Sequence, residues 1–127
     1  MKTALTCLVA ALGVAVAAPV WAEGDAAAGE KVFKKCKACH AVGEGAKKKV
    51  GPPLNGIIGA PAGTFEGFKY SDNLMELAEG GLIWDDATMA AYLTKPKDVI
   101  PKGKMSFAGL KKEADIENVI AYLATFE

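Results

Sequence analysis

Two cysteines and a histidine stand close together near one third of the way along the chain. They form a Cys-x-x-Cys-His motif at residues 36–40, which is the attachment motif of a c-type haem. Two thiols can add across the two vinyl groups of one haem, so the reaction requires them at a short, fixed separation. The imidazole that follows is then placed to bind the iron. We therefore predict that Cys36 and Cys39 hold one haem c covalently and that His40 is an axial iron ligand.

Two other uses of a Cys-x-x-Cys pair fit less well. A thioredoxin-like redox pair follows a strand in a βαβ unit, and no such unit is readable here. Structural zinc needs four Cys or His ligands. The chain has three Cys and one His, and Cys7 lies in an apolar N-terminal run, so too few ligands remain.

The second axial ligand must come from another residue type, because His40 is the only histidine. The remaining strong protein ligand is a methionine thioether. Met75 and Met89 lie in predicted helices, where core filling is the better interpretation. Met105 lies in a predicted loop far downstream of His40, which lets the chain wrap around the ring and bring the sulfur to its opposite face. We predict Met105 as the ligand.

Helices joined by long loops must position these side chains. Asp25 can cap a first helix that reaches Cys36, so that the haem motif closes it. A second helix is predicted to start at Ser71 and end at Gly80-Gly81, and a third to start at Asp85 or Asp86 and end at Pro96. The helical spacing of Ile116, Val119, Ile120 and Leu123 predicts a last helix. Residues 43–63 and 101–109 read as loops, and no run alternates like a strand. The prediction is a single all-α domain.

The N-terminal 22 residues have the pattern of a secretory signal peptide. A positive start at Lys2 precedes an apolar run, and Val20 and Ala22 are small residues at positions −3 and −1 of a cleavage site. We predict cleavage after Ala22, a mature domain over residues 23–127, and a location in the periplasm. The alternative is an uncleaved anchor, since the run approaches the ~20 residues that span a bilayer.

Charge is balanced in total but segregated along the chain. The 15 basic residues are all lysines and face 15 acidic residues. Lysines dominate residues 31–49 and 95–112, whereas acids dominate residues 66–86. Such a dipole can steer association with a charged partner. The lack of arginine and of a basic aromatic stripe argues against a nucleic-acid partner.

Several further segments occur in the order found in a known family. They are residues 36–40, Gly51-Pro52-Pro53-Leu54-Asn55-Gly56, Gly67-Phe68-Lys69-Tyr70-Ser71-Asp72, Trp84, Tyr92, Pro96, Ile100-Pro101 and Lys104-Met105-Ser106-Phe107-Ala108-Gly109. With them the chain resembles the class I c-type cytochromes, closest to the bacterial cytochrome c2 and mitochondrial cytochrome c group. The resemblance covers essentially all of residues 23–127.

This resemblance implies a small cytochrome c fold in which short helices and long loops wrap one covalent haem. The first and last helices would cross, pressing Gly29 and Phe33 against Val119 and Tyr122. The Pro52 carbonyl would accept a hydrogen bond from the His40 ring and so set its tautomer. The other haem-pocket residues would be Tyr70 and Trp84 on a propionate, Tyr92 near the Met105 sulfur, and Phe107 as a shield.

The resemblance also implies a function. The protein would be a monomeric, periplasmic one-electron carrier, not an enzyme, between a membrane cytochrome bc complex and either an oxidase or a photosynthetic reaction centre. Its exposed haem edge would be ringed by docking lysines, namely Lys35, Lys37, Lys49, Lys97, Lys104 and Lys111. Two alternatives stay open. One is a haem enzyme or gas sensor with a weak Met105 bond, and the other is a subunit docked permanently to one enzyme.

The chain departs from the family pattern in places that bear on the haem. Ala60 stands where family members often carry an arginine that neutralises a propionate. Gly103 stands where they often carry a threonine before Lys-Met, so we expect a more flexible Met105 loop. Extra sequence also lies between Tyr70 and Trp84 relative to the mitochondrial pattern.

Overall fold

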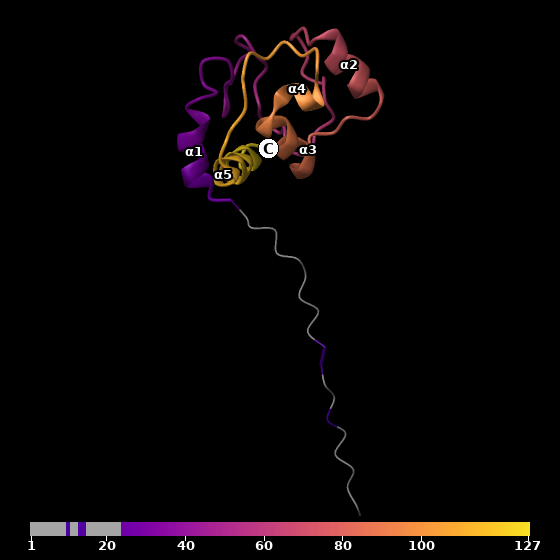
Figure 1. The fold of residues 1–127 in the computed structure, drawn as a ribbon. Coiled ribbons are helices and arrows are strands. Elements are labelled where there is room, and N and C mark those ends of the chain that lie inside the picture. Colours follow the sequence, from indigo (N-terminus) through magenta and orange to yellow (C-terminus); the bar gives the residue numbers. More distant parts are fainter. Residues whose placement is uncertain (1–9, 11–12, 15–23) are drawn as a thin grey trace, which may run out of the picture.

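The protein is described by a computed structural model that covers residues 24–127 and residues 10, 13 and 14. This part contains the helices α1 (Ala26–Phe33), α2 (Asp72–Glu79), α3 (Asp86–Thr94), α4 (Pro96–Val99) and α5 (Glu113–Ala124), shown in Figure 1. The described residues include no strand, only an isolated antiparallel bridge between Pro61 and Ile83. The predicted all-α class is confirmed. The predicted signal peptide lies outside the described residues, apart from residues 10, 13 and 14.

The contact between α1 and α5 joins the two ends of the domain. Figure 1 shows α5 nearly end-on beside α1. The helices approach so closely at Gly29 that an added Cβ would collide with the Asn118 carbonyl and lie 2.8 Å from the Tyr122 Cβ. The rings of Phe33 and Tyr122 have centroids 5.5 Å apart, and Val119 is fully buried in the same core. The predicted packing of Gly29 and Phe33 on the last helix is confirmed.

The predicted helix starts at Asp25, Ser71 and Asp85 are also confirmed. Each side chain accepts a hydrogen bond from a backbone N–H of the first turn: Asp25 from Ala27 at 2.9 Å, Ser71 from Leu74 at 3.1 Å, and Asp85 from Thr88 at 2.8 Å. These bonds satisfy donors that an α-helix leaves unpaired at its N-terminus.

The end of α1 differs from the prediction. Regular helix stops at Phe33, so the expectation that it reaches Cys36 is wrong. Residues 34–39 continue as tight turns, in which the Cys36 N–H donates to the Phe33 carbonyl at 2.8 Å. The haem motif therefore follows the helix as a wound turn. Hydrogen bonds between residues three apart replace most of the regular helical bonds, although His40 still bonds to Cys36 four residues earlier.

The short helix α4 was not predicted. Pro96 ends α3, as expected, but it also begins the next helix at its first turn. Proline suits that position because its fixed φ is helical and its missing N–H would be unpaired there anyway. The chain thus turns between α3 and α4 without a connecting loop.

The hydrophobic core is built from α1, α3, α5 and the loops that connect the helices. Its buried members are Val32, Phe33, Ala62, Trp84, Met89, Leu93, Ile100, Leu110, Ile116, Val119 and Leu123. Met89 is 6% exposed, which confirms its interpretation as a core residue. Met75 on α2 is 39% exposed, so the same interpretation is wrong for Met75. Met75 lies on α2, and no residue of α2 is buried in the core.

Candidate haem site

Cys36, Cys39 and His40 come together in the turns that follow α1. The two thiols are free and half-buried, and the His40 N–H donates to the Cys36 carbonyl at 2.8 Å. This bond closes the turn. In the sequence, His40 directly follows Cys39. Burial raises the pKa of the Cys36 thiol, and the nearby Cys39 raises it further. The Cys36 thiol is therefore held in its protonated form.

A proline carbonyl orients the His40 ring. Nδ1 of His40 lies 2.7 Å from the Pro52 carbonyl oxygen, so Nδ1 carries the proton and Nε2 keeps its lone pair. Burial lowers the pKa of His40, against the opposing effect of the Pro52 bond. The neutral imidazole, which is the metal-binding form, is favoured. The contact between His40 and Pro52 that the resemblance implied is present.

Gly51 allows this arrangement. An added Cβ at Gly51 would collide with the His40 ring, at 2.9 Å from Nδ1 and closer still to another ring atom. The chain before Pro52 therefore passes over the imidazole at a separation that only glycine permits. The Gly51 N–H also donates to the Cys39 carbonyl at 2.8 Å. Sequence reasoning did not assign Gly51 a role, although a glycine directly before Pro-Pro was a visible signal.

The Met105 sulfur is held by a tyrosine. The Tyr92 hydroxyl donates to Sδ at 3.7 Å, within the range of a bond to sulfur. Tyr92 lies on α3, and its ring packs on Trp84 with centroids 4.8 Å apart. Burial raises the pKa of Tyr92, which keeps the hydroxyl protonated and able to donate. Met105 itself is half-buried in the loop between α4 and α5.

The other predicted pocket residues differ in their contacts. Trp84 is buried, and its backbone pairs with Ala60 and Gly59. The Tyr70 hydroxyl accepts from the Phe65 N–H at 3.1 Å, which leaves its own proton free to be donated. Phe107 is half-buried and packs against the core.

The six predicted docking lysines are all exposed. Lys35 and Lys111 line one surface hollow of about 290 Å³, together with Lys112 and Asp115. Lys49 reaches the Lys37 carbonyl at 3.1 Å. The structure thus brings four of the six together as two local pairs, and no contact joins Lys97 or Lys104 to either pair.

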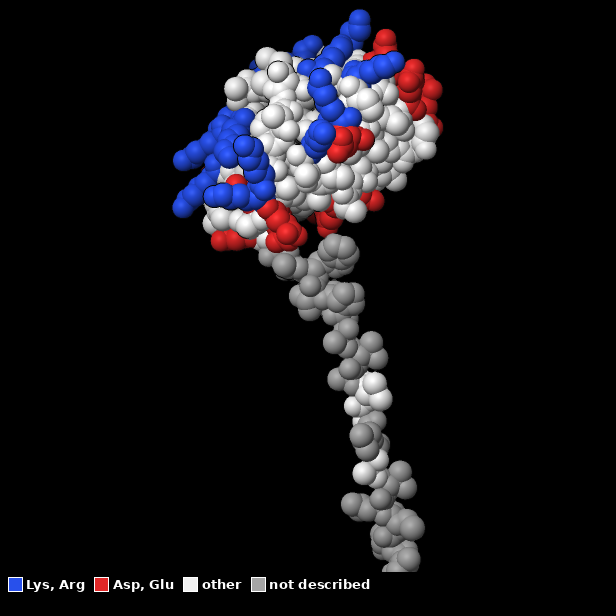
Figure 2. Space-filling model, viewed as in Figure 1, with Lys and Arg blue, Asp and Glu red and all other residues white. Residues whose placement is uncertain are grey.

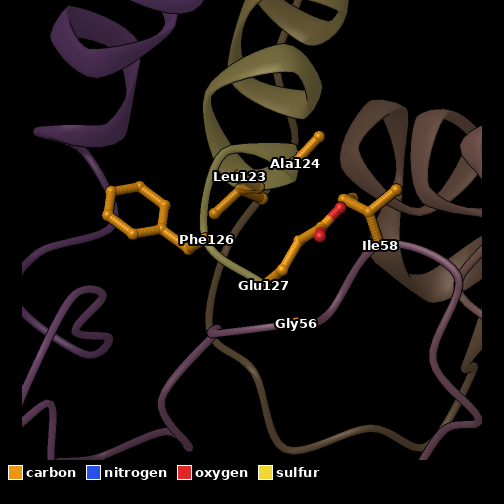
Figure 3. Close-up of a pocket in the computed structure, with 6 residues that line it drawn as sticks. All are labelled: Gly56, Ile58, Leu123, Ala124, Phe126 and Glu127. Carbon is orange, nitrogen blue, oxygen red and sulfur yellow. The ribbon is translucent and has the colours of Figure 1, made fainter.

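A second hollow lies beside the C-terminus of α5 (Figure 3) and has about 70 Å³. Its lining residues are Gly56, Ile58, Leu123, Ala124, Phe126 and Glu127. It has no sulfur or imidazole ligand and is too small for a haem. The described residues also hold no cluster of His, Cys, Asp and Glu that could bind a separate metal ion.

Comparison with known proteins gives consistent results. A family model described as cytochrome c matches residues 26–127. A cytochrome c2 of Afifella marina is 50% identical over 101 residues, covering 80% of this chain and 82% of the relative. A cytochrome c-550 of Ancylobacter novellus is 55% identical over 100 residues, covering 79% and 94%.

Solved structures of similar fold are also c-type cytochromes. Cytochrome c2 from Rhodospirillum Centenum has a TM-score of 0.77 and 42% identity, covering 81% of this chain and 98% of that one. Cytochrome cH from Methylobacterium extorquens has a TM-score of 0.73 and 45% identity, covering 80% and 99%.

The chain therefore belongs to the cytochrome c family, as a class I c-type cytochrome close to the cytochromes c2. It binds one haem c covalently through the Cys36 and Cys39 pair, and it is an electron carrier, not an enzyme. The residues present fit a haem. Cys36 and Cys39 are free thiols, the neutral His40 imidazole keeps the lone pair of Nε2, and Gly51 leaves room for the imidazole ring.

Proposed function

We propose that His40 and Met105 are the axial ligands of the haem iron in a periplasmic one-electron carrier. The observation that carries this proposal is the hydrogen bond from the Tyr92 hydroxyl to the Met105 sulfur. Met89 is buried in the core, and Met75 sits on the exposed face of α2. Met105 has a half-buried sulfur with a donor aimed at it, as expected for a ligand whose orientation matters.

The chain's own residues would keep the site nearly unchanged between oxidation states. Haem iron supplies a one-electron couple, and ligation by histidine and methionine raises its potential. Pro52 fixes the His40 ring through Nδ1, and Tyr92 holds the Met105 sulfur. Neither residue has to move when the charge changes. This preorganisation supports rapid electron exchange and leaves no open position for a substrate.

The proposed partners are a membrane cytochrome bc complex as donor and an oxidase or a photosynthetic reaction centre as acceptor. Lys35, Lys37, Lys49, Lys97, Lys104 and Lys111 are proposed to form the docking surface. Their exposure supports this role, as does the shared hollow at Lys35 and Lys111. The protein is proposed to act as a monomer.

Residues 1–22 are proposed to be a signal peptide that directs the chain to the periplasm. No helix among the described residues is long and apolar enough to cross a membrane. N-terminal sequencing of the exported protein checks the boundary, and a first residue other than Glu23 would contradict it.

The substitution Met105→Ala tests the proposed ligation. A thioether is a soft, neutral ligand that favours reduced iron, so its loss should lower the reduction potential by on the order of hundreds of mV. The ferrous variant should also bind carbon monoxide, whereas the parent should resist it. Potentiometry and an absorption spectrum, with its weak red-end band from an iron–thioether bond, measure both effects.

Met75→Ala and Met89→Ala are the matched controls. Met89→Ala should lower thermal stability, because Met89 is 6% exposed, but it should keep the band. If Met105→Ala keeps the parent potential and band while one control loses them, the ligand assignment is wrong.

A further inference from the structure

Asn73 connects α2 to the loop that carries Met105. Its Oδ1 accepts a hydrogen bond from the Lys102 backbone N–H at 2.9 Å, across 29 residues of sequence. Close by, Nζ of Lys104 donates to the Lys69 carbonyl at 3.3 Å. Both bonds join the segment around the start of α2 to the residues directly before Met105.

The Met105 loop has little regular structure of its own. Residues 101–109 contain no helix. Gly103 in their midst has the greatest backbone freedom of any residue type. Its N–H donates to the Ile100 carbonyl at 3.0 Å, which closes a turn but does not anchor the loop to another part of the fold. The Asn73 bond provides such an anchor.

The helix that carries Asn73 contributes little to the core. None of its residues is buried, although Leu74, Leu77 and Ala78 pack partly against the core. The Ser71 cap and the first turn of α2 hold Asn73 in position. In Figure 1, α2 lies at the edge of the molecule, on the side away from α1. The contact of α2 with the Met105 loop therefore explains its presence better than burial of its side chains does.

We propose that Asn73 is a positioning residue for Met105. By holding Lys102, it keeps the loop closed and lowers the population in which the Met105 sulfur has left the iron. This inference rests on the proposed function, in which Met105 is the ligand. An external ligand competes only when the sulfur has left, so its apparent affinity follows that population.

Imidazole binding to the oxidised holoprotein tests the proposal. Asn73→Ala removes one acceptor whose net contribution corresponds to roughly a tenfold change in an equilibrium. We expect imidazole to bind this variant roughly tenfold more tightly and to remove the thioether band at a correspondingly lower concentration. Asn73→Asp retains an acceptor oxygen and should stay close to the parent.

Asn118→Ala is the matched control. Asn118 Oδ1 accepts from the Asp25 N–H at 2.8 Å, so this variant loses the same kind of bond where α1 meets α5. It should lower the melting temperature and leave the imidazole affinity unchanged. Equal affinity in the parent and Asn73→Ala, or an equal gain in Asn118→Ala, would overturn the positioning role.

Met105→Ala, measured alongside, separates the two levels of the argument. If it loses the thioether band while Asn73→Ala behaves as the parent, only the role of Asn73 is overturned. If Met105→Ala keeps the band, the proposed ligation fails, and the role of Asn73 fails with it.

Discussion

His40 and Met105 are each held by one hydrogen bond from a residue that is not itself a proposed ligand. Pro52 accepts from the His40 ring at 2.7 Å, and Tyr92 donates to the Met105 sulfur at 3.7 Å. The two bonds differ in direction. Acceptance at His40 increases the basicity of the ring, whereas donation to Met105 withdraws electron density from the sulfur. The electron donation of His40 and that of Met105 are therefore set by separate hydrogen bonds.

Tyr92→Phe is predicted to lower the reduction potential. The hydroxyl proton weakens electron donation by the sulfur, which disfavours the oxidised state, so its removal should favour that state. A neutral hydrogen bond is worth about 1 kcal/mol, and ~59 mV corresponds to a tenfold change for one electron. The expected shift is therefore tens of mV, measured by potentiometry. Tyr122→Phe, in the contact between α1 and α5, should leave the potential unchanged. A raised potential in Tyr92→Phe would contradict the argument.

At this scale the residues of one local motif are predicted directly, whereas the distant contacts that were predicted, such as that of Tyr92 with Met105, came only from the family resemblance. The haem motif is local, and its covalent chemistry requires a fixed spacing, so Cys36, Cys39 and His40 are readable directly. The role of Gly51 depends on where the His40 ring lies. The bond between Asn73 and Lys102 spans 29 residues between two segments without a shared motif. Contacts of this kind follow from how the chain packs.

At the scale of elements, α1 and α5 approach each other closely at Gly29. A Cβ there would collide with the backbone carbonyl of Asn118, which cannot rotate away as a flexible side chain could. The neighbouring Phe33 ring then packs on Tyr122. The glycine therefore sets the distance between the two helices, and that distance determines the packing around Phe33.

Gly29→Ala is accordingly predicted to destabilise the protein, although alanine is the better helix former. The propensity gain is about 1 kcal/mol, and forcing apart a packed contact costs about 1–3 kcal/mol. Contact with rigid backbone points to the upper part of that range and a net loss, measured by denaturant unfolding. Gly80→Ala is the control, because a Cβ there lies 3.4 Å from its nearest neighbour, in ordinary contact. A Gly29→Ala protein more stable than the parent would contradict this account.

Helix starts are predictable because capping is local chemistry, as at Asp25, Ser71 and Asp85. Helix ends are less so. The apolar spacing continues past Phe33 to Cys36, yet the backbone tightens into turns there. The helix α4 was missed because Pro96 carries two signals, the end of one helix and the start of the next. Pro96 does both, so the end of α3 was predicted and the start of α4 was not.

At the scale of the whole molecule, the described helices leave long loops without regular structure, notably residues 40–71 and 100–112. Side chains hold these loops at few points, such as Asn55, which both accepts from and donates to the Gly43 backbone at 2.8 Å. A small domain of this kind has limited apolar area to offset the entropy of ordering its loops. A covalent haem would supply a large part of that area.

Replacing both Cys36 and Cys39 by alanine should therefore leave a largely disordered chain. Without attached haem, the loops lose the surface on which they pack, while the entropic cost of ordering them stays the same. Circular dichroism and a thermal scan measure the loss, and Ala38→Ser, which leaves both thiols in place, is the control. A compact double variant that melts cooperatively would show that the protein core alone directs folding.

Figure 2 shows that charge is unevenly distributed over the surface. Blue lysine side chains gather on the left over α1 and along the upper edge, and red acidic side chains lie at the upper right over α2 and below α1. The formal total of zero for the full sequence therefore conceals local clusters of one charge sign. An arrangement of this kind orients a small carrier as it approaches a charged partner.

The final prediction concerns this field. Lys35 and Lys111 share one hollow, so Lys35→Glu with Lys111→Glu reverses the charge of a single site. Exposed charges are screened beyond about 8 Å at physiological salt. The double variant should therefore react with the proposed donor, a cytochrome bc complex, roughly tenfold more slowly at low salt, with the difference shrinking as salt rises. Its reduction potential should stay near the parent's, because the substitutions leave His40, Met105 and their hydrogen bonds intact.

Stopped-flow rates across a salt series measure this effect. Lys69→Glu with Lys95→Glu is the control, since it changes the net charge by the same amount at exposed lysines outside the proposed docking set. If position matters, the control reacts faster than the test variant at every low salt concentration, because its changed charges do not face the partner in the docked complex. Equal slowing in both variants would mean that only total charge matters. A parent rate that is flat in salt would contradict electrostatic docking altogether.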